Sequence, residues 1–210
     1  MPRISAEREE ATRRRILTAA REVFVEKGFH RASVDDVVAA SGLSMGTLYN
    51  YFPSKDELIR ASILGANRAE SDAVLADTQS AHSHEDRLAR AVQGWWRFTV
   101  EAPGVPAFVT EAWAEASRRP LIRELMALRN ERGVTVVSIL LRECIGRGEL
   151  PSDVDVDGLA RTLAALFDGM LVEYVVGGGS LRLVDAQRRV RLVMRAAGWV
   201  GDSEQDREAS

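Results

Sequence analysis

Apolar residues recur at helical spacing along nearly the whole chain, and the alternation that is typical of β-strands is almost absent. Over residues 6–27 they form one stripe, which Gly28 ends as a C-cap. The same reading predicts further helices over 34–40, 45–49, 55–77, 85–101, 106–117, 120–147, 155–176 and 184–197. The pattern therefore predicts an all-α protein.

Two of the predicted helices are short and close together. Ser33 opens "SVDD", a serine with an acid three residues later, which is close to a capping box. Gly42 in "SGL" can take the positive φ that a sharp turn requires, and Ser44 can cap the next helix. Two short helices joined in this way predict a helix-turn-helix.

The second short helix has an outer face suited to DNA. The residues of this face are Ser44, Met45, Gly46, Thr47 and Asn50. Gly46 removes a side chain, so the backbone can approach another surface closely. Leu48 and Phe52 are expected to point into the core, whereas Tyr49, Tyr51 and Lys55 can reach phosphate oxygens. We therefore expect phosphate contacts mostly from Ser33, Ser44, Thr47, Tyr49, Tyr51 and Lys55, and base contacts from Met45, Gly46, Thr47 and Asn50.

Composition narrows the class of protein. The chain has 210 residues, a formal net charge of −3 and a single cysteine, Cys144, so an internal disulfide is excluded. The stretch from Arg3 to Arg15 is charged and unlike a signal peptide, and no apolar run approaches the roughly 20 residues of a membrane helix. We expect a soluble cytoplasmic protein with no membrane partner.

The stretch "HRASVDDVVAASGLSMGTLYNYFPSKDELI", residues 30–59, closely resembles the DNA-binding region of the tetracycline-repressor (TetR) family, and residues 16–29 resemble that family's first helix. Tyr51 stands where many members have His. The resemblance implies a homodimeric, non-enzymatic repressor that a ligand releases from double-stranded operator DNA. Its expected parts are a three-helix DNA-binding head over 1–54, a helical ligand-binding and dimerisation domain over 55–201, and a disordered tail over 202–210.

The middle helices are rich in aromatic residues. Two explanations are open, because such residues at helical spacing fill cores but can also line a ligand cavity. The second hypothesis selects Asn67, Trp95, Trp96, Phe108, Glu111 and Trp113 as ligand-binding residues. Apolar walls with Glu111 or Glu115 nearby favour an apolar or cationic molecule. Residues 90–176 also loosely resemble the C-terminal domain of betaine-type regulators of the family.

The predicted helix over 155–176 is apolar around much of its girth, more than a surface helix needs. Pairing it and the last helix with their copies in a second chain would give a four-helix bundle. The expected interface residues are Leu163, Phe167, Met170, Tyr174, Val190 and Met194. The alternative is a helix buried within one chain.

Other chemistry is weakly indicated. His82 and His84 lack a firm metal-ligand pattern, Cys144 has apolar neighbours, and "GGGS" at 177–180 lacks the Lys-Ser/Thr of a phosphate loop. We expect no metal, cofactor or catalytic site. Two other functions stay open: an architectural DNA-binding protein without a ligand, and a helical enzyme that carries a DNA-binding head.

Overall fold

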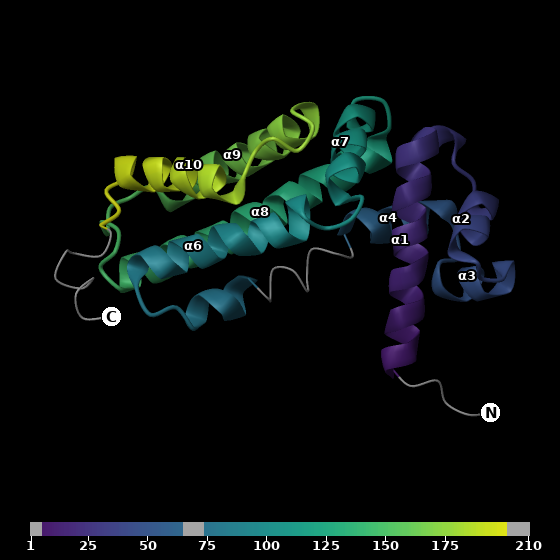
Figure 1. The fold of residues 1–210 in the computed structure, drawn as a ribbon, viewed down its shortest axis with the longest axis horizontal. Helices are drawn as coiled ribbons and strands as arrows, with labels where there is room; N and C mark the ends of the chain where they lie inside the picture. Colours follow the sequence, from purple (N-terminus) through teal and green to yellow (C-terminus); the bar gives the residue numbers. More distant parts are fainter. Residues whose placement is uncertain (1–5, 65–73, 201–210) are drawn as a thin grey trace. The chain divides into compact units, whose positions relative to one another are not determined.

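The computed structural model describes residues 6–64 and 74–200, and in these ranges every regular element is helical (Figure 1). Between α4 and α6, residues 74–79 are also helical. The other elements are α1 (Ala6–Arg31), α2 (Val34–Ser41), α3 (Met45–Tyr51), α4 (Lys55–Leu64), α6 (His84–Trp95), the π-helical η1 (Trp96–Val100), α7 (Val105–Ala116), α8 (Pro120–Gly146), α9 (Val156–Val176) and α10 (Leu183–Ala196). The all-α prediction is confirmed.

The predicted start of α2 and the turn after it are confirmed. The backbone N–H of Asp36 donates to Ser33 Oγ (3.1 Å), and the backbone N–H of Ser33 donates to Asp36 Oδ2 (2.9 Å), so the capping box is complete. Gly42 has φ 63° and ψ 24°, the left-handed conformation that a glycine adopts without strain. These local signals fix where α2 begins and ends.

Two predicted helices differ from the structure in detail, and a third lies partly outside the described residues. Helical geometry breaks at Gly28 (φ 71°) as predicted, but α1 resumes for one short turn to Arg31. The predicted helix over 85–101 widens into a π-helix after Trp95, where the N–H of Glu101 donates to the carbonyl of Trp96. Of the predicted helix over 55–77, residues 65–73 lie outside the described residues, as does the predicted tail over 202–210.

The chain forms two compact units. The first combines Met1–Ala66 with Pro103–Leu128, and the second combines Asn67–Ala102 with Arg129–Ser210. The expected functional boundary after residue 54 therefore does not coincide with the boundary between compact units. Helices α4 and α7 belong to the first unit, and α8 contributes residues to both.

The core of the first unit is centred on α1, which packs against α2, α4 and α7. Phe24 and Phe29 stack with their ring centroids 4.9 Å apart, and Phe108 of α7 lies 5.6 Å from Phe29. All three side chains are buried. Phe108 therefore helps to hold α7 against the helix that supports α2.

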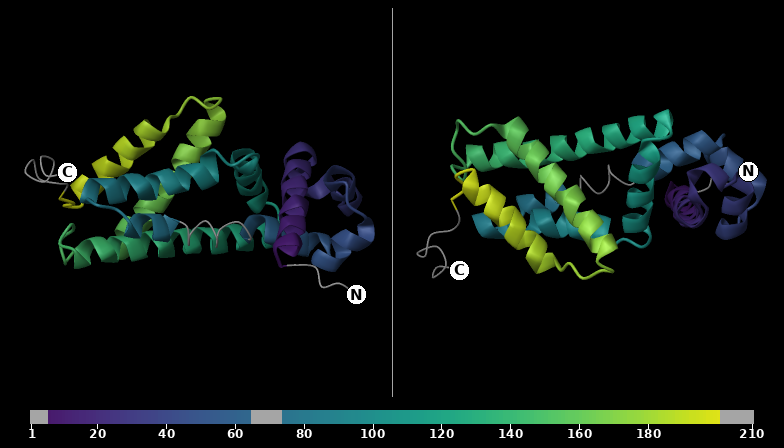
Figure 2. Two further views of the ribbon diagram at one scale, coloured as in Figure 1. Left: turned by 60° about the horizontal axis from the view of Figure 1, so that its bottom comes forward. Right: turned by 90° about the horizontal axis from the view of Figure 1, so that it is seen from above.

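In the second unit, α10 packs along α6, and α9 packs against η1 and α10 (Figure 2). A buried ion pair joins Arg87 of α6 to Glu149, with Nη2 and Oε1 3.3 Å apart. The backbone N–H of Val200 donates to the carbonyl of Glu149 (2.9 Å), so the same residue also fixes the segment after α10. Across the described ranges, no helix is long and apolar enough to cross a membrane.

Candidate DNA-binding surface and ligand cavity

One face of helix α3 is buried in the first unit, and the opposite face is exposed. Leu48 and Phe52 are buried and anchor it to the first unit. Ser44 caps it: the backbone N–H of Thr47 donates to Ser44 Oγ (3.1 Å), and the two hydroxyl oxygens lie 2.8 Å apart. The anchored underside and satisfied cap leave the outer face of α3 free for another molecule.

The outer face of α3 contains most of the residues predicted to contact DNA. Ser44, Gly46, Tyr49 and Asn50 are exposed, and Met45, Thr47 and Tyr51 are half-buried. A Cβ placed on Gly46 would meet only Ser44 Oγ, at 4.0 Å. The space above this glycine is therefore open, as a close approach of the backbone to DNA requires.

Two predicted DNA contacts are engaged inside the protein. The Ser33 hydroxyl caps α2, and the Lys55 ammonium donates to the carbonyl of His30 (3.2 Å). Burial, together with the positive charge of Arg119, lowers the pKa of Lys55. In this arrangement both side chains stabilise the first unit. To contact a phosphate, Lys55 would have to leave the His30 carbonyl.

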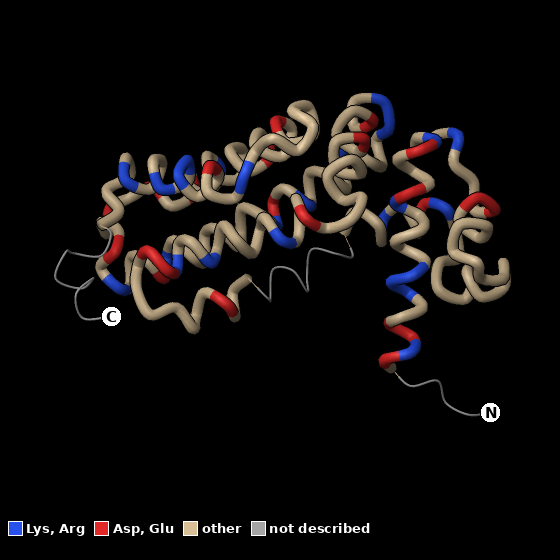
Figure 3. The backbone as a smooth tube through the Cα atoms, in the orientation of Figure 1, with Lys and Arg blue, Asp and Glu red and all other residues tan. Residues whose placement is uncertain are grey.

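Basic residues of α1 near the turn were not identified from the sequence. The guanidinium of Arg13 lies 5.4 Å from the ring centroid of Phe52, and Arg15 lies beside Gly42. Figure 3 shows Lys and Arg repeated along α1. The run Arg13, Arg14 and Arg15 was the available signal, but helical spacing alone could not show which of them reach α3.

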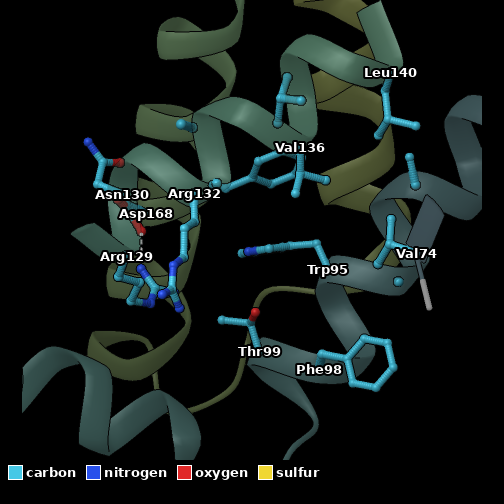
Figure 4. Close-up of a pocket in the computed structure, with 16 residues that line it drawn as sticks. Val74, Trp95, Phe98, Thr99, Arg129, Asn130, Arg132, Val136, Leu140 and Asp168 are labelled. Carbon is cyan, nitrogen blue, oxygen red and sulfur yellow. Dashed lines mark hydrogen bonds and ion pairs between the residues drawn. The ribbon is translucent and has the colours of Figure 1, made fainter. Parts of the chain in front are cut away.

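The second unit contains a cavity of about 160 Å³ between α6, η1, α8 and α9 (Figure 4). Its walls are mostly apolar. The ring of Trp95 lies 4.7 Å from that of Phe167, and both line the cavity. The lining residues are Val74, Ala91, Gly94, Trp95, Phe98, Thr99, Arg129, Asn130, Arg132, Gly133, Val136, Val137, Leu140, Ala164, Phe167 and Asp168.

One edge of the cavity is charged. Arg129 Nη1 of α8 lies 3.4 Å from Asp168 Oδ1 of α9, and Arg132 lines the same edge. Figure 4 shows the guanidinium ends of Arg129 and Arg132 together, with the indole nitrogen of Trp95 turned toward that side. Burial raises the pKa of Asp168, against the opposing effect of Arg129.

The structure brings one of the predicted ligand-binding residues, Trp95, into this cavity. Trp96 is buried instead, with its indole N–H donating to Glu101 Oε1 (2.9 Å) and its ring against Tyr174. Phe108, Glu111 and Trp113 belong to the first unit, and Asn67 lies outside the described residues. Sequence reasoning missed Arg129, Arg132 and Asp168; a single acid within the apolar stretch "LFDGM" was the signal.

Comparison with known proteins decides the family. Residues 16–62 match the family described as bacterial regulatory proteins of the tetR family, and residues 84–197 match the C-terminal part of BetI-type transcriptional repressors. This chain belongs to the TetR family. It is therefore a helix-turn-helix transcriptional regulator and not an enzyme.

Individual members agree with this assignment. The TetR-family chain is 33% identical over 162 residues to the HTH-type transcriptional regulator UidR of Escherichia coli (strain K12), covering 77% of this chain and 81% of the relative. It is 28% identical over 172 residues to BetI of E. coli (strain K12 / DH10B), covering 80% and 85%. The solved structure of Salmonella enterica GusR matches with a TM-score of 0.71 and 28% identity, covering 94% of this chain and all of that one.

Of the six residues predicted at a dimer interface, four are buried in the second unit and two, Phe167 and Tyr174, are half-buried. Leu163, Met170, Val190 and Met194 are buried in the second unit, and the rings of Phe167 and Tyr174 contact Trp95 and Trp96. These contacts lie within one chain, and the role of the six residues at a dimer interface stays a prediction. Outward-facing apolar residues of α9 and α10 are Val172, Val176, Val184 and Leu192.

The remaining reactive side chains are engaged or protected. His84 Nε2 lies 3.6 Å from Glu149 Oε1. Burial raises the pKa of the Cys144 thiol to about 12, so it stays protonated and unreactive at neutral pH. Among residues 6–64 and 74–200, no group of three or more His, Cys, Asp or Glu could hold a metal ion.

Proposed function

We propose that this TetR-family regulator is a repressor that binds a near-palindromic operator as a homodimer and is released by a small-molecule effector. The observation that carries the proposal is the presence of two distinct sites in one chain. The first unit presents a capped, anchored α3 with an open outer face, and the second contains a largely apolar cavity. A regulator of this kind needs one site for DNA and another for a signal.

On DNA, the exposed face of α3 would enter the major groove. Asn50 carries an amide that can pair with a base edge, and Gly46 allows the backbone to come close. Met45 and Thr47 flank them, while Tyr49, Tyr51 and Ser44 can donate to phosphates. Arg13 and Arg15 would add phosphate contacts from α1. Ser33 and Lys55 would act chiefly by holding α2 and α1 in place.

The homodimer would form through the outward faces of α9 and α10. Val176 and Leu192 are 81% and 70% exposed, and Val172 and Val184 add further exposed apolar surface on the same two helices. A Cβ on Gly169 would meet nothing within 4 Å, so another helix could approach α9 there. Exposed apolar surface on a folded protein is typical of an interface where the side chains are contiguous. A second copy supplies the second α3 that a palindromic operator requires.

Release by an effector requires that the DNA-bound and released states differ in their affinity for it. Helix α8 is the element suited to relate the two sites. It contributes Arg129 and Arg132 to the cavity, and its residues 120–128 belong to the unit that contains α3. Directly before α8, Arg119 donates to the carbonyl of Phe29 (3.2 Å) and pairs with Asp56 of α4 (3.7 Å). Movement at this point would reach α1 and α4.

Selection of binding sites from random DNA tests this function. We expect a near-palindromic sequence whose half-sites are separated by about one DNA turn (~34 Å) or a little more, bound by two or more chains. Binding of a single half-site by a monomer would contradict the dimeric proposal. Operator affinity that no small molecule changes would favour the alternative, an architectural DNA-binding protein.

A further inference from the structure

Two hydrogen-bonding groups in the wall of the cavity have no partner among the described residues. The first is the indole N–H of Trp95. The neighbouring Trp96 donates its indole N–H to Glu101 Oε1 (2.9 Å), whereas no residue of the described ranges accepts from the indole N–H of Trp95. Figure 4 shows this nitrogen turned toward the polar edge of the cavity. A donor that faces a cavity in this way is available to a ligand.

The second group is the hydroxyl of Thr99, which differs from most other buried hydroxyls. Ser41, Ser62 and Thr78 are buried, and each donates to a backbone carbonyl three or four residues earlier. In the part of the chain that the structure describes, the buried hydroxyls without a hydrogen bond are those of Thr99 and Ser138, and of these Thr99 lines the cavity. Thr99 lies in the π-helical η1, a geometry that is frequent at functional sites.

The charged groups at the polar edge are already engaged. Arg129 Nη1 lies 3.4 Å from Asp168 Oδ1, and Arg132 also has an interaction partner. A cation would have to share Asp168 with Arg129, and an anion would have to draw an arginine away from its present contact. Each would also leave water, which is strongly disfavoured for a charge that gains no partner of its own. An uncharged ligand meets neither obstacle, and the amide of Asn130 at the same edge is itself uncharged.

The rest of the cavity fits one apolar ring. Trp95 and Phe167 form an aromatic wall, with their ring centroids 4.7 Å apart, and Val136 and Leu140 line the cavity from α8. The volume of about 160 Å³ is close to that of an engineered protein cavity of about 150 Å³ that binds benzene. A single ring therefore fills most of the space and leaves room for a small substituent.

We propose that the effector is a compact uncharged molecule, one apolar ring with one hydroxyl group, which accepts from the indole N–H of Trp95 and donates to Thr99 Oγ1. A hydroxyl group accepts and donates at once, so it can pair with both groups. This inference rests on the proposed effector function of the cavity. It narrows the apolar or cationic molecule expected from the sequence to an uncharged one, because Glu111 and Glu115 belong to the first unit.

Four probes of similar size test the proposal on the full-length protein. Benzyl alcohol is uncharged and has the hydroxyl, ethylbenzene has the same shape without it, benzylammonium is a cation and benzoate is an anion. NMR titrations that follow the backbone amide of Gly133, which lines the cavity, give the dissociation constants. We expect benzyl alcohol to bind about tenfold or more tightly than ethylbenzene, which would displace water and leave both groups unpaired. The two ions should bind more weakly than the alcohol. Benzyl alcohol alone should shift the indole N–H signal of Trp95 as a new hydrogen bond does.

Variants locate the two hydrogen bonds. Thr99→Val keeps the shape of the side chain and should weaken benzyl alcohol binding about three- to tenfold, with ethylbenzene unchanged. It should not lower the denaturation midpoint, because the hydroxyl has no partner to lose. Trp95→Phe keeps an aromatic wall and should likewise reduce the preference for the alcohol over ethylbenzene.

Thr78→Val is the matched control. Thr78 is a buried threonine of the same unit outside the cavity lining, and its hydroxyl donates to the carbonyl of Leu75 (2.9 Å). The substitution should lower the denaturation midpoint and leave every dissociation constant unchanged.

Tightest binding by either ion, equal binding of benzyl alcohol and ethylbenzene, or no binding of benzyl alcohol would each overturn the proposal. An unchanged preference for the alcohol in both Thr99→Val and Trp95→Phe would do the same, because the hydroxyl would then be recognised elsewhere. Failure of the proposed function is separate: it would appear as the absence of any operator in the selection from random DNA, which needs no effector.

Discussion

The surroundings of α3 in the first unit differ from those of the cavity in the second unit. Around α3, polar groups are bound to one another: Ser33 with Asp36, Ser44 with Thr47, and Lys55 with the His30 carbonyl. The second unit has a cavity, a π-helical segment beside it and a long ion pair across its edge. Close packing gives one well-defined arrangement, whereas a cavity and a π-helix are typical of functional sites that can adjust. On the proposed function, the DNA-binding surface of α3 is pre-formed and the effector cavity can adjust its shape.

The largest effect is expected from the buried ion pair of the second unit. Arg87→Met leaves the fully buried Glu149 carboxylate without its arginine. We expect the free energy of unfolding of this unit to fall by about 3–5 kcal/mol, measured by chemical denaturation with tryptophan fluorescence. Arg87→Met combined with Glu149→Leu should recover most of the loss. A single variant as stable as the natural protein would show that the second unit does not depend on this pair.

Dimerisation should have the next largest effect, and it separates surface from core on α9 and α10. Leu192→Arg places a charge on the proposed interface without disturbing the interior. We expect sedimentation to show monomers and operator affinity to fall by about 100-fold or more, because the second half-site is no longer bound in the same complex. Ile139→Arg, a partly exposed apolar residue of α8, is the control. An unchanged dimer in Leu192→Arg would move the interface elsewhere.

The outer face of α3 can be divided into base and phosphate contacts. Asn50→Ala should relax the base preference at one position of each half-site, at a cost of about 1–3 kcal/mol for the preferred base. Tyr49→Phe should instead weaken binding to all sequences alike, since only a phosphate donor is removed. Repeating the selection from random DNA with each variant measures both. An unchanged consensus with Asn50→Ala would exclude a base contact by that amide.

The smallest effect is expected at the cap of α2. Ser33→Ala removes the side-chain acceptor for the N–H of Asp36 and should destabilise the first unit by about 1 kcal/mol.

The Lys27 ammonium, 2.6 Å from the Asp36 carboxylate, and the Ser33 donors lower the pKa of Asp36 from 3.8 to about 2. Because the pKa of Asp36 is depressed in the folded protein, the stabilisation that its ionised carboxylate contributes is present above pH 3.8 and is lost as the pH falls through about 2.

An NMR titration of Asp36 checks this pH dependence. The midpoint should lie near 2 in the natural protein and should rise in Lys27→Met, where the largest cause of the shift is missing. A midpoint at the ordinary value of a free aspartate in the natural protein would show that the pair does not persist in solution.

The helix-turn-helix could be predicted from the sequence because its determinants are local. The capping box of Ser33, the positive φ of Gly42 and the cap at Ser44 each involve residues within three or four positions of one another. Short-range hydrogen bonds and backbone preferences decide such features, and the sequence displays both. The exposed face of α3 follows directly, because buried Leu48 fixes which side of the helix points inward.

The cavity could not be predicted in the same way, because its lining residues are far apart in the sequence. Trp95 and Trp96 are adjacent, yet one lines the cavity and the other is buried against Tyr174. The π-helical segment that begins at Trp96 changes the helical register there, and helical spacing does not reveal it. Arg129 and Asp168 are 39 positions apart and meet only once α8 and α9 pack.

If effector binding and DNA binding are linked, each must change the affinity of the other, and this reciprocity is the direct test of the proposed function. The affinity of an effector found by a thermal-shift screen is measured on the full-length protein with and without saturating operator DNA, and the operator affinity is measured with and without that effector. We predict that each weakens the other by the same factor, because linkage between two sites is mutual. Equal affinity of the effector for free and operator-bound protein would contradict the account, since the cavity would then have no influence on DNA binding.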